Sequence, residues 1–423
     1  MTIRWLVRAL AALLVLLLAL LGWSTWRFAH WAPPDAPQPP DPVAQAWFID
    51  DYASARADFL RRGDALADTF TGVERLAIPV PSRSGASGLF VDGLYIPAQG
   101  GERRRLLVVS SGVHGVEGPT GSAVQRLFMH EVLTAQHLQG PLADTGVLLL
   151  HALNPYGFAR YRRFTENNVD LNRNASTDHA LYQTVNAGYP VVDSLINPTG
   201  PADAGTAGNR FFHLRSVALI ARHGMPALRQ AVLQGQYQKP PGIYFGGQAQ
   251  EPQLAALGPR IAPILDAYPL SMSLDLHTGW GARGTLHLFF NPPADAKVRQ
   301  GLEAAFAGQP IDWGTGSDFY TVTGDFAGWL GQLRRGGVHL PAVFEFGTMD
   351  SQATLGAIKS LHVTVLENQG AQHGYATADD RTRIERDYRE MFYPSSPDWR
   401  TKVIYDSRAM FAAVLANWPR VQP

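Results

Sequence analysis

Short, almost wholly apolar segments, each followed by a glycine-containing turn, constrain most strongly what this chain can fold into. The four clearest segments are residues 106–110, 147–151, 270–276 and 343–346. Runs of this length without polar alternation are typical of strands that are buried on both faces. Helical patterns lie between them or follow them, near residues 122–136, 215–234, 253–267 and 379–418. The sequence therefore predicts an α/β fold with a mixed, largely parallel sheet and helices on both faces.

The N-terminus carries a candidate membrane segment. Arg4 and Arg8 precede an uncharged run over residues 9–26, close to the ~20 residues that cross a bilayer core. Because the basic residues come first, we expect an anchor over residues 1–31 with the body on the periplasmic side. A signal peptide that is cleaved, with secretion of the body, is the alternative. A Pro-rich linker over 32–42 and one folded domain over 43–423 follow.

Composition narrows the possible chemistry. The chain has 36 basic and 36 acidic residues, so it lacks the charge excess of a nucleic-acid-binding protein. It has no cysteine, which excludes disulfides, thiolate catalysis and Cys-type zinc sites. Any metal must therefore be held by His, Asp and Glu. Ser110 and Ser111 do not lie in a G-x-S-x-G motif, which argues against a serine hydrolase.

Candidate metal ligands follow two of the predicted strands. His114 and Glu117 lie three residues apart in a glycine-rich turn, and His277 follows a later strand. Each feature alone is common: H-x-x-E occurs by chance, and a histidine at a strand end is often structural. Together they supply the three protein ligands of a catalytic zinc site. Asp275 lies on the same face as His277 and is a candidate acceptor for its imidazole N–H, a role that a backbone carbonyl can also fill.

An arginine-rich segment and a buried acid complete the set. Residues 154–174 begin and end with turn-forming residues, which predicts a loop. Its arginines form either a solvated basic loop or a site for a substrate carboxylate and a developing oxyanion. Glu345 lies between two phenylalanines, and burial would raise its pKa to suit a general base. Alternatively, Glu345 ends its strand in an ion pair with Arg334 or Arg335.

Five segments, taken in order, resemble the zinc carboxypeptidase family: HGVEG, NPYGF, RRFTENNVDLNRN, LDLHTG and FEFG. The resemblance is strongest to an incompletely characterised bacterial branch near the aspartoacylase- and succinylglutamate desuccinylase-like deacylases. It spans about residues 106–347. It implies a zinc carboxypeptidase-like fold and one Zn²⁺ per chain, with His114, Glu117 and His277 as its ligands.

The resemblance also implies roles for residues outside the metal site. Glu345 corresponds to the general acid/base. Arg163 corresponds to the arginine that stabilises the oxyanion, and Arg162 takes this role if the loop is shifted by one residue. Binding of the substrate is implied for Asn172 and Arg173, which hold its carboxylate, and for Tyr320, a looser match, which caps it.

The expected activity is zinc-dependent hydrolysis of an amide next to a free carboxylate. The substrate would be a peptide, or an N-acyl amino acid if the protein is a deacylase that uses the same residues. A non-catalytic zinc-containing binding module is a further alternative. Residues 235–247 depart from the digestive carboxypeptidases, so a preference for the leaving residue cannot be inferred if this segment lies over the cleft.

Overall fold

The computed structural model describes residues 3–290, 295–313 and 322–422. Within them, eight strands form one sheet in the order β1-β2-β4-β3-β5-β8-β6-β7. The central strands β4, β3, β5 and β8 are parallel, whereas β1, β2 and β6 add antiparallel pairs. The strands are β1 (Glu74–Pro79), β2 (Phe90–Ile96), β3 (Arg105–Ser111), β4 (Thr145–His151), β5 (Leu270–Gly279), β6 (Leu286–Phe290), β7 (Asp312–Trp313) and β8 (Val338–Gly347). The predicted mixed, largely parallel sheet is confirmed.

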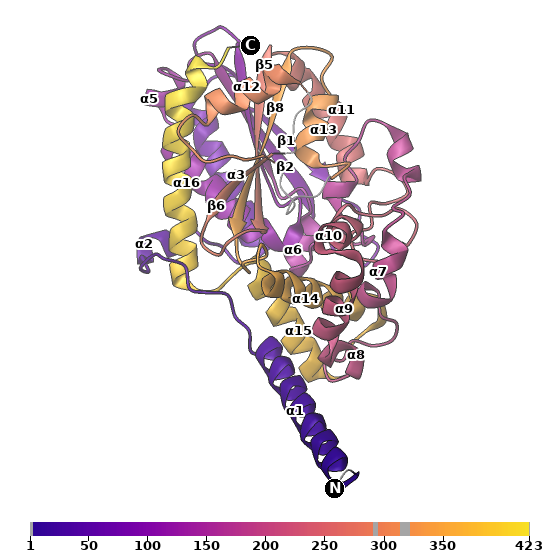
Figure 1. Ribbon diagram of the computed structural model, residues 1–423. Coiled ribbons are helices and arrows are strands. Elements are labelled where there is room, and N and C mark those ends of the chain that lie inside the picture. The colour runs from indigo at the N-terminus through magenta and orange to yellow at the C-terminus, as the bar shows by residue number, and fades with distance from the viewer. Residues whose placement is uncertain (1–2, 291–294, 314–321, 423) are drawn as a thin grey trace.

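The four predicted strands are β3, β4, β5 and β8, and burial on both faces explains their apolar sequences. In β3, Leu107 and Val109 belong to the core on one face, and Leu106 and Val108 belong to the core on the other. Helices cover both faces of the sheet (Figure 1). The first core contains residues of α3 (Tyr52–Thr69), α4 (Gly118–Glu131), α12 (Ala296–Ala305) and α16 (Pro397–Asn417). The second contains residues of α11 (Pro252–Asp266) and α13 (Phe326–Gln332).

A separate group of helices lies at the end of the sheet from which α1 extends (Figure 1). It comprises α7 (Tyr189–Ile196), α8 (Ala207–Arg210), α9 (Phe212–His223), α10 (Met225–Leu233), α14 (Thr354–His373) and α15 (Ala378–Phe392). The helix predicted over 215–234 is two helices, because Gly224 adopts φ +81° between α9 and α10. The C-terminal helical stretch is likewise divided into α15 and α16. Two further short helices are α2 (Pro42–Gln45) and α5 (Ala135–Leu138).

Helix α1 (Ile3–Ala29) projects from the body as a single rod (Figure 1). Its most apolar 18-residue window has a mean hydropathy of 2.4 and is exposed throughout, so the helix is long and apolar enough to cross a membrane. Its last turn packs on the body: the Phe28 ring stacks on His213 of α9 at 4.8 Å and lies 5.5 Å from His362 of α14. The helix therefore joins the body beside α9 and α14.

The segment predicted as a loop contains a helix. Residues Pro155–Arg160 form α6, so the prediction was wrong for this part. The reason is that Asn154 acts as an N-cap, with its side chain accepting a hydrogen bond from Gly157 N at 2.9 Å, and Pro155 occupies the first helical position. The chain then runs without regular structure to the 3₁₀ turn Leu171–Arg173.

Candidate active site

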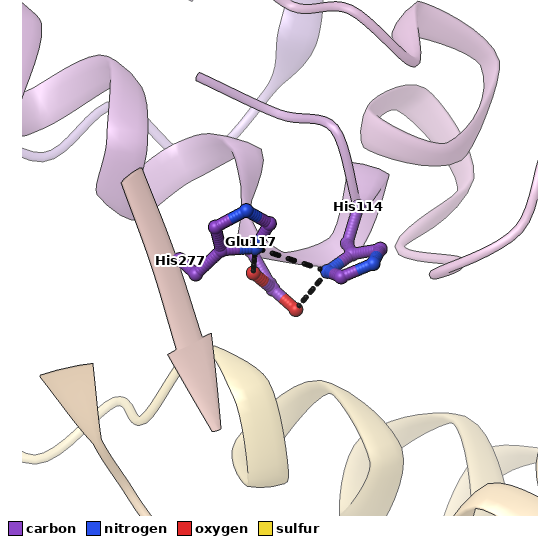
Figure 2. A group of neighbouring side chains, drawn as sticks. All are labelled: His114, Glu117 and His277. Carbon is purple, nitrogen blue, oxygen red and sulfur yellow. Dashed lines mark hydrogen bonds and ion pairs between the residues drawn. The ribbon is translucent and has the colours of Figure 1, made fainter. Parts of the chain in front are cut away.

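Three buried side chains meet at the carboxyl ends of two neighbouring parallel strands. After β3, His114 precedes the 3₁₀ turn Gly115–Glu117 and Glu117 is its last residue, whereas His277 belongs to β5. Glu117 Oε1 lies 2.9 Å from His114 Nδ1, Glu117 Oε2 lies 3.0 Å from His277 Nδ1, and the two Nδ1 atoms are 3.1 Å apart (Figure 2). The cluster expected from the sequence is thus assembled from residues 163 positions apart.

Two aspartates determine which ring nitrogens face the cluster. His114 Nε2 lies 3.1 Å from Asp170 Oδ1, and His277 Nε2 lies 2.8 Å from Asp275 Oδ2. Because carboxylates accept hydrogen bonds, we assign the imidazole protons to both Nε2 atoms. Both Nδ1 lone pairs then converge with the Glu117 carboxylate, an arrangement that only a shared cation or an added proton stabilises. Two imidazole nitrogens and a carboxylate oxygen are a donor set that suits zinc.

Asp275 was expected from the sequence as a partner for His277, and the structure shows this bond. Its second oxygen accepts a hydrogen bond from Ser110 Oγ at 2.6 Å. The matching role of Asp170 was not anticipated. Its place in a loop rich in arginines indicates that the carboxylate has a charged partner, but not that it also contacts His114.

The structure brings one of the two candidate oxyanion arginines to the cluster. Arg163 is buried, donates from Nε to Asp170 Oδ2 at 2.9 Å, and places Nη1 3.6 Å from Glu117 Oε1. Arg162 instead donates to Glu367 Oε1 at 2.7 Å, and Arg160 is exposed. Burial opposes ionisation of Asp170, but the charge of Arg163 outweighs it and holds the pKa of Asp170 well below its usual value.

Asn172 and Arg173 line the same cavity as the cluster. Asn172 Oδ1 accepts from Phe326 N at 2.9 Å. Arg173 is buried, and it donates from Nε and Nη2 to Leu233 O and from Nη1 to Asn172 O. These bonds engage three of the five N–H donors of a guanidinium. Tyr320, the expected capping residue, lies outside the described residues.

Glu345 lies beside the cluster because it pairs in register with His277 across β5 and β8. Its Oε1 accepts a hydrogen bond from Trp280 N at 3.0 Å. Burial raises the pKa of Glu345 to about 7; the charge of His277 opposes this shift and that of Glu117 adds to it. The alternative of an ion pair at the strand exit is wrong, because Arg335 pairs with Asp266 and Arg334 donates to Ser271 Oγ.

One cavity of about 400 Å³ is lined by the three candidate metal ligands and by Arg163, Asn172, Arg173 and Glu345. Tyr244 also lines it, and the Tyr244 ring lies 5.2 Å from the guanidinium of Arg163 and 6.0 Å from that of Arg173. The segment 235–247 therefore forms part of the cavity wall, a position that sequence reasoning left open.

A family model described as "Protein of unknown function (DUF2817)" matches residues 48–406. The chain belongs to this family. No curated protein matches the sequence. Similar solved structures include bovine thrombin-activatable fibrinolysis inhibitor in complex with a tick carboxypeptidase inhibitor, at 13% identity over 74% of this chain and 95% of that one, with a TM-score of 0.42.

Two bacterial structures are also similar. A putative carboxypeptidase A from Shewanella denitrificans has 10% identity over 85% of this chain and 69% of that one, with a TM-score of 0.39. A succinylglutamate desuccinylase/aspartoacylase from Rhodobacter sphaeroides has 14% identity over 71% and 66%, with a TM-score of 0.33. These structures belong to the two groups that the sequence motifs resemble. In this DUF2817 member, the side chains of the site themselves indicate its chemistry.

Those side chains combine a metal-binding donor set with groups for acid–base and anion chemistry. Three ligands leave a fourth position of a tetrahedral zinc site open. Glu345 is a buried acid able to exchange protons near neutral pH. Arg163 and Arg173 are buried cations on the same cavity. Such a combination suits hydrolysis of a bond close to an anionic group.

Proposed function

We propose that this chain is a zinc-dependent hydrolase that cleaves an amide bond adjacent to a free carboxylate. One observation carries the proposal. A buried glutamate with a raised pKa lies in register beside three converging metal-binding groups, in a cavity that also holds two buried arginines. Such a hydrolase needs both an acid that transfers protons and cations that bind anionic groups.

One zinc ion per chain would be held by His114, Glu117 and His277. When bound, zinc supplies Lewis acidity: it polarises a carbonyl and lowers the pKa of water toward ~7. Asp170 and Asp275 would keep the Nε2–H tautomers that aim both Nδ1 atoms at the ion.

Glu345 would transfer the proton of the reaction. The oxygen of a water molecule adds to the amide carbon, the C–N bond breaks, and Glu345 carries a proton from the water to the leaving nitrogen. Its pKa of about 7 lets it both accept and release a proton near neutral pH. Arg163 would donate to the oxyanion, a contribution of roughly 3–4 kcal/mol for a donor of this kind.

Asn172 and Arg173 would hold the substrate carboxylate. Two N–H donors of Arg173 are available beyond the three bonds described, and a planar guanidinium binds a carboxylate through paired donors. The fixed distance from this carboxylate to Glu345 would then determine which amide is hydrolysed. Arg162, bound to Glu367, would support the loop and not the oxyanion.

Two other functions would use part or all of the same site. An N-acyl amino acid deacylase would use the same residues, and the aliphatic part of the cavity wall favours it over a general peptidase. A non-catalytic zinc module does not require Glu345, whose burial is unfavourable without a use for it. We further propose that α1 anchors the domain over 43–423 at the periplasmic face of a membrane.

Hydrolysis of a matched substrate set tests the proposal. The zinc-loaded full chain in phospholipid nanodiscs is offered short peptides and N-acetyl amino acids, each with a free or an amidated carboxyl end, and products are identified by mass spectrometry. We expect hydrolysis of free-carboxylate forms only, abolished by a chelator and restored by zinc. Equal hydrolysis of amidated forms would contradict the role of Arg173, and hydrolysis that resists the chelator would contradict the zinc.

A further inference from the structure

The cavity extends well beyond the residues that the chemistry needs, and its far wall is aliphatic. This wall, here called the aliphatic chamber, is formed by α7, α9, α10 and α14. Its lining includes Val192, Leu195, Ile220, Leu228, Val232 and Leu361. Ser216, Thr364 and Arg229 also line the cavity.

The aliphatic chamber is formed by residues that lie far apart in the sequence. The wall residues of α7, α9, α10 and α14 belong to one hydrophobic cluster, which also contains Tyr244 from the segment 235–247. Phe28 of α1 belongs to the same cluster. The side chain of a single amino acid would not require an aliphatic surface formed by four helices.

Several hydrophobic residues in or near α7 and α9 are exposed on the outside of the molecule. Outside α1, six large hydrophobic residues are exposed among the described residues, and four of them lie in or next to α7 and α9: Val185, Val191, Leu214 and Val217. Val217 is 51% exposed, and Ile220, about one turn later in α9, lines the chamber. Exposed apolar residues that gather in one region indicate an interaction surface.

Helix α9, which carries two of these exposed residues, lies beside the candidate membrane anchor. The last turn of α1 contacts α9 and α14, the helices that line the chamber (Figure 1). If α1 spans a bilayer, the outer face of α9 is held close to the membrane surface. A molecule dissolved in the lipid would then lie close to the helices that line the chamber.

We propose that the substrate is an N-acyl amino acid with a long alkyl chain, and that this chain lies in the aliphatic chamber. The inference rests on the proposed function and specifies its substrate class. Water adds to the acyl carbon, the C–N bond breaks, and the products are a fatty carboxylate and an amino acid whose new amine takes the proton from Glu345. The amino-acid carboxylate stays with Arg173 and Asn172.

Chain length is the first arm of the test. Acetyl-, hexanoyl- and dodecanoyl-glycine are compared with the full chain in nanodiscs: kcat/KM is measured for the zinc-loaded wild type, and binding is measured by calorimetry with Glu345→Gln. A buried methylene contributes about 0.8 kcal/mol, so we expect affinity to rise up to fourfold per methylene until the chamber is filled. Equal affinity for acetyl- and dodecanoyl-glycine would overturn the proposal.

Variants that fill the chamber are the second arm. Ala357 on α14 and Ser216 on α9 line it from different helices, so Ala357→Phe and Ser216→Phe should each weaken dodecanoyl-glycine at least tenfold and change acetyl-glycine less than twofold. Ala371→Phe, at an exposed position of α14, is the matched control and should change neither. Equal losses for both ligands, or a loss in the control, would overturn the assignment of the chamber.

The two proposals fail separately. Hydrolysis of acetyl-glycine with no dependence on chain length would leave the proposed function in place and remove the chamber's role. Binding that depends on chain length, with no hydrolysis by the zinc-loaded wild type, would support alkyl-chain binding in the chamber and contradict the proposed hydrolase activity.

Discussion

The aspartate behind His277 offers a test of the metal site that leaves its three ligands in place. Asp275 is fully buried, and its two oxygens contact His277 Nε2 at 2.8 Å and Ser110 Oγ at 2.6 Å. The substitution Asp275→Asn keeps the shape and still offers an oxygen to the imidazole N–H. It removes only the negative charge that favours the Nε2–H tautomer and makes His277 a stronger ligand.

The expected size of the effect follows from this one bond. A hydrogen bond to a charged group contributes about 1.5–3 kcal/mol and a neutral one about 0.5–1.5 kcal/mol. The change therefore removes roughly 1–2 kcal/mol from zinc binding, or about five- to thirtyfold in Kd. Changes of 10–100-fold are typical when a ligand's supporting carboxylate is altered, so the two estimates overlap.

Zinc Kd is measured by competition with a chelating dye, and the unfolding temperature of the zinc-free form is measured beside it. Asp92→Asn is the matched control. Asp92 belongs to β2, is equally buried, and forms an ion pair with Arg56 of α3. We expect the control to lower the unfolding temperature and leave zinc Kd within twofold. A wild-type zinc Kd in Asp275→Asn, or the same loss in Asp92→Asn, would refute the reasoning.

Three further predictions follow from the same geometry. Glu345→Gln should keep one zinc per chain and lower kcat by about 10²–10⁴-fold; full turnover in metal-loaded protein would exclude Glu345 as the base. Arg163→Lys removes the Nε bond to Asp170 and should lower kcat by about 10²–10³-fold with little change in KM; a change in KM alone would assign Arg163 to substrate binding. Burial lowers the pKa of His151 to about 3, so the unfolded chain binds a proton below about pH 6.5 that the folded chain rejects. This lowers the free energy of unfolding by about 1.5 kcal/mol between pH 6.5 and pH 5. In urea titrations at the two pH values, the decrease should be smaller by that amount in His151→Gln. The same decrease in both proteins would show that His151 is not the responsible group.

Much of the fold was predictable because a strand buried on both faces has a short, almost wholly apolar sequence. The apolar runs predicted β3, β4, β5 and β8 but underestimated their lengths; in β5 the missed end contains the polar residues His277 and Thr278. The break at Gly224 was missed because its effect depends on the left-handed conformation of that residue, which the helical pattern does not report.

The candidate site was predictable where its function restricts which residue types can be used and how they are spaced. His114, Glu117 and His277 were recognised because metal binding restricts both type and spacing. The partnership of Asp170 with His114 was not, since nothing local indicates which buried atom a carboxylate will meet across 56 positions. The aliphatic chamber was also missed. Its leucines and valines resemble ordinary core residues in the sequence, and they line a cavity only because of how four helices pack together.

Metal content is the most direct test of the central claim, that His114, Glu117 and His277 hold one zinc ion for hydrolysis. The full chain and His277→Ala are purified in parallel, exposed to zinc, desalted, and analysed for metal by inductively coupled plasma mass spectrometry. The wild type should carry one zinc per chain and His277→Ala almost none, with both folded by circular dichroism. One zinc per chain in folded His277→Ala would contradict the account.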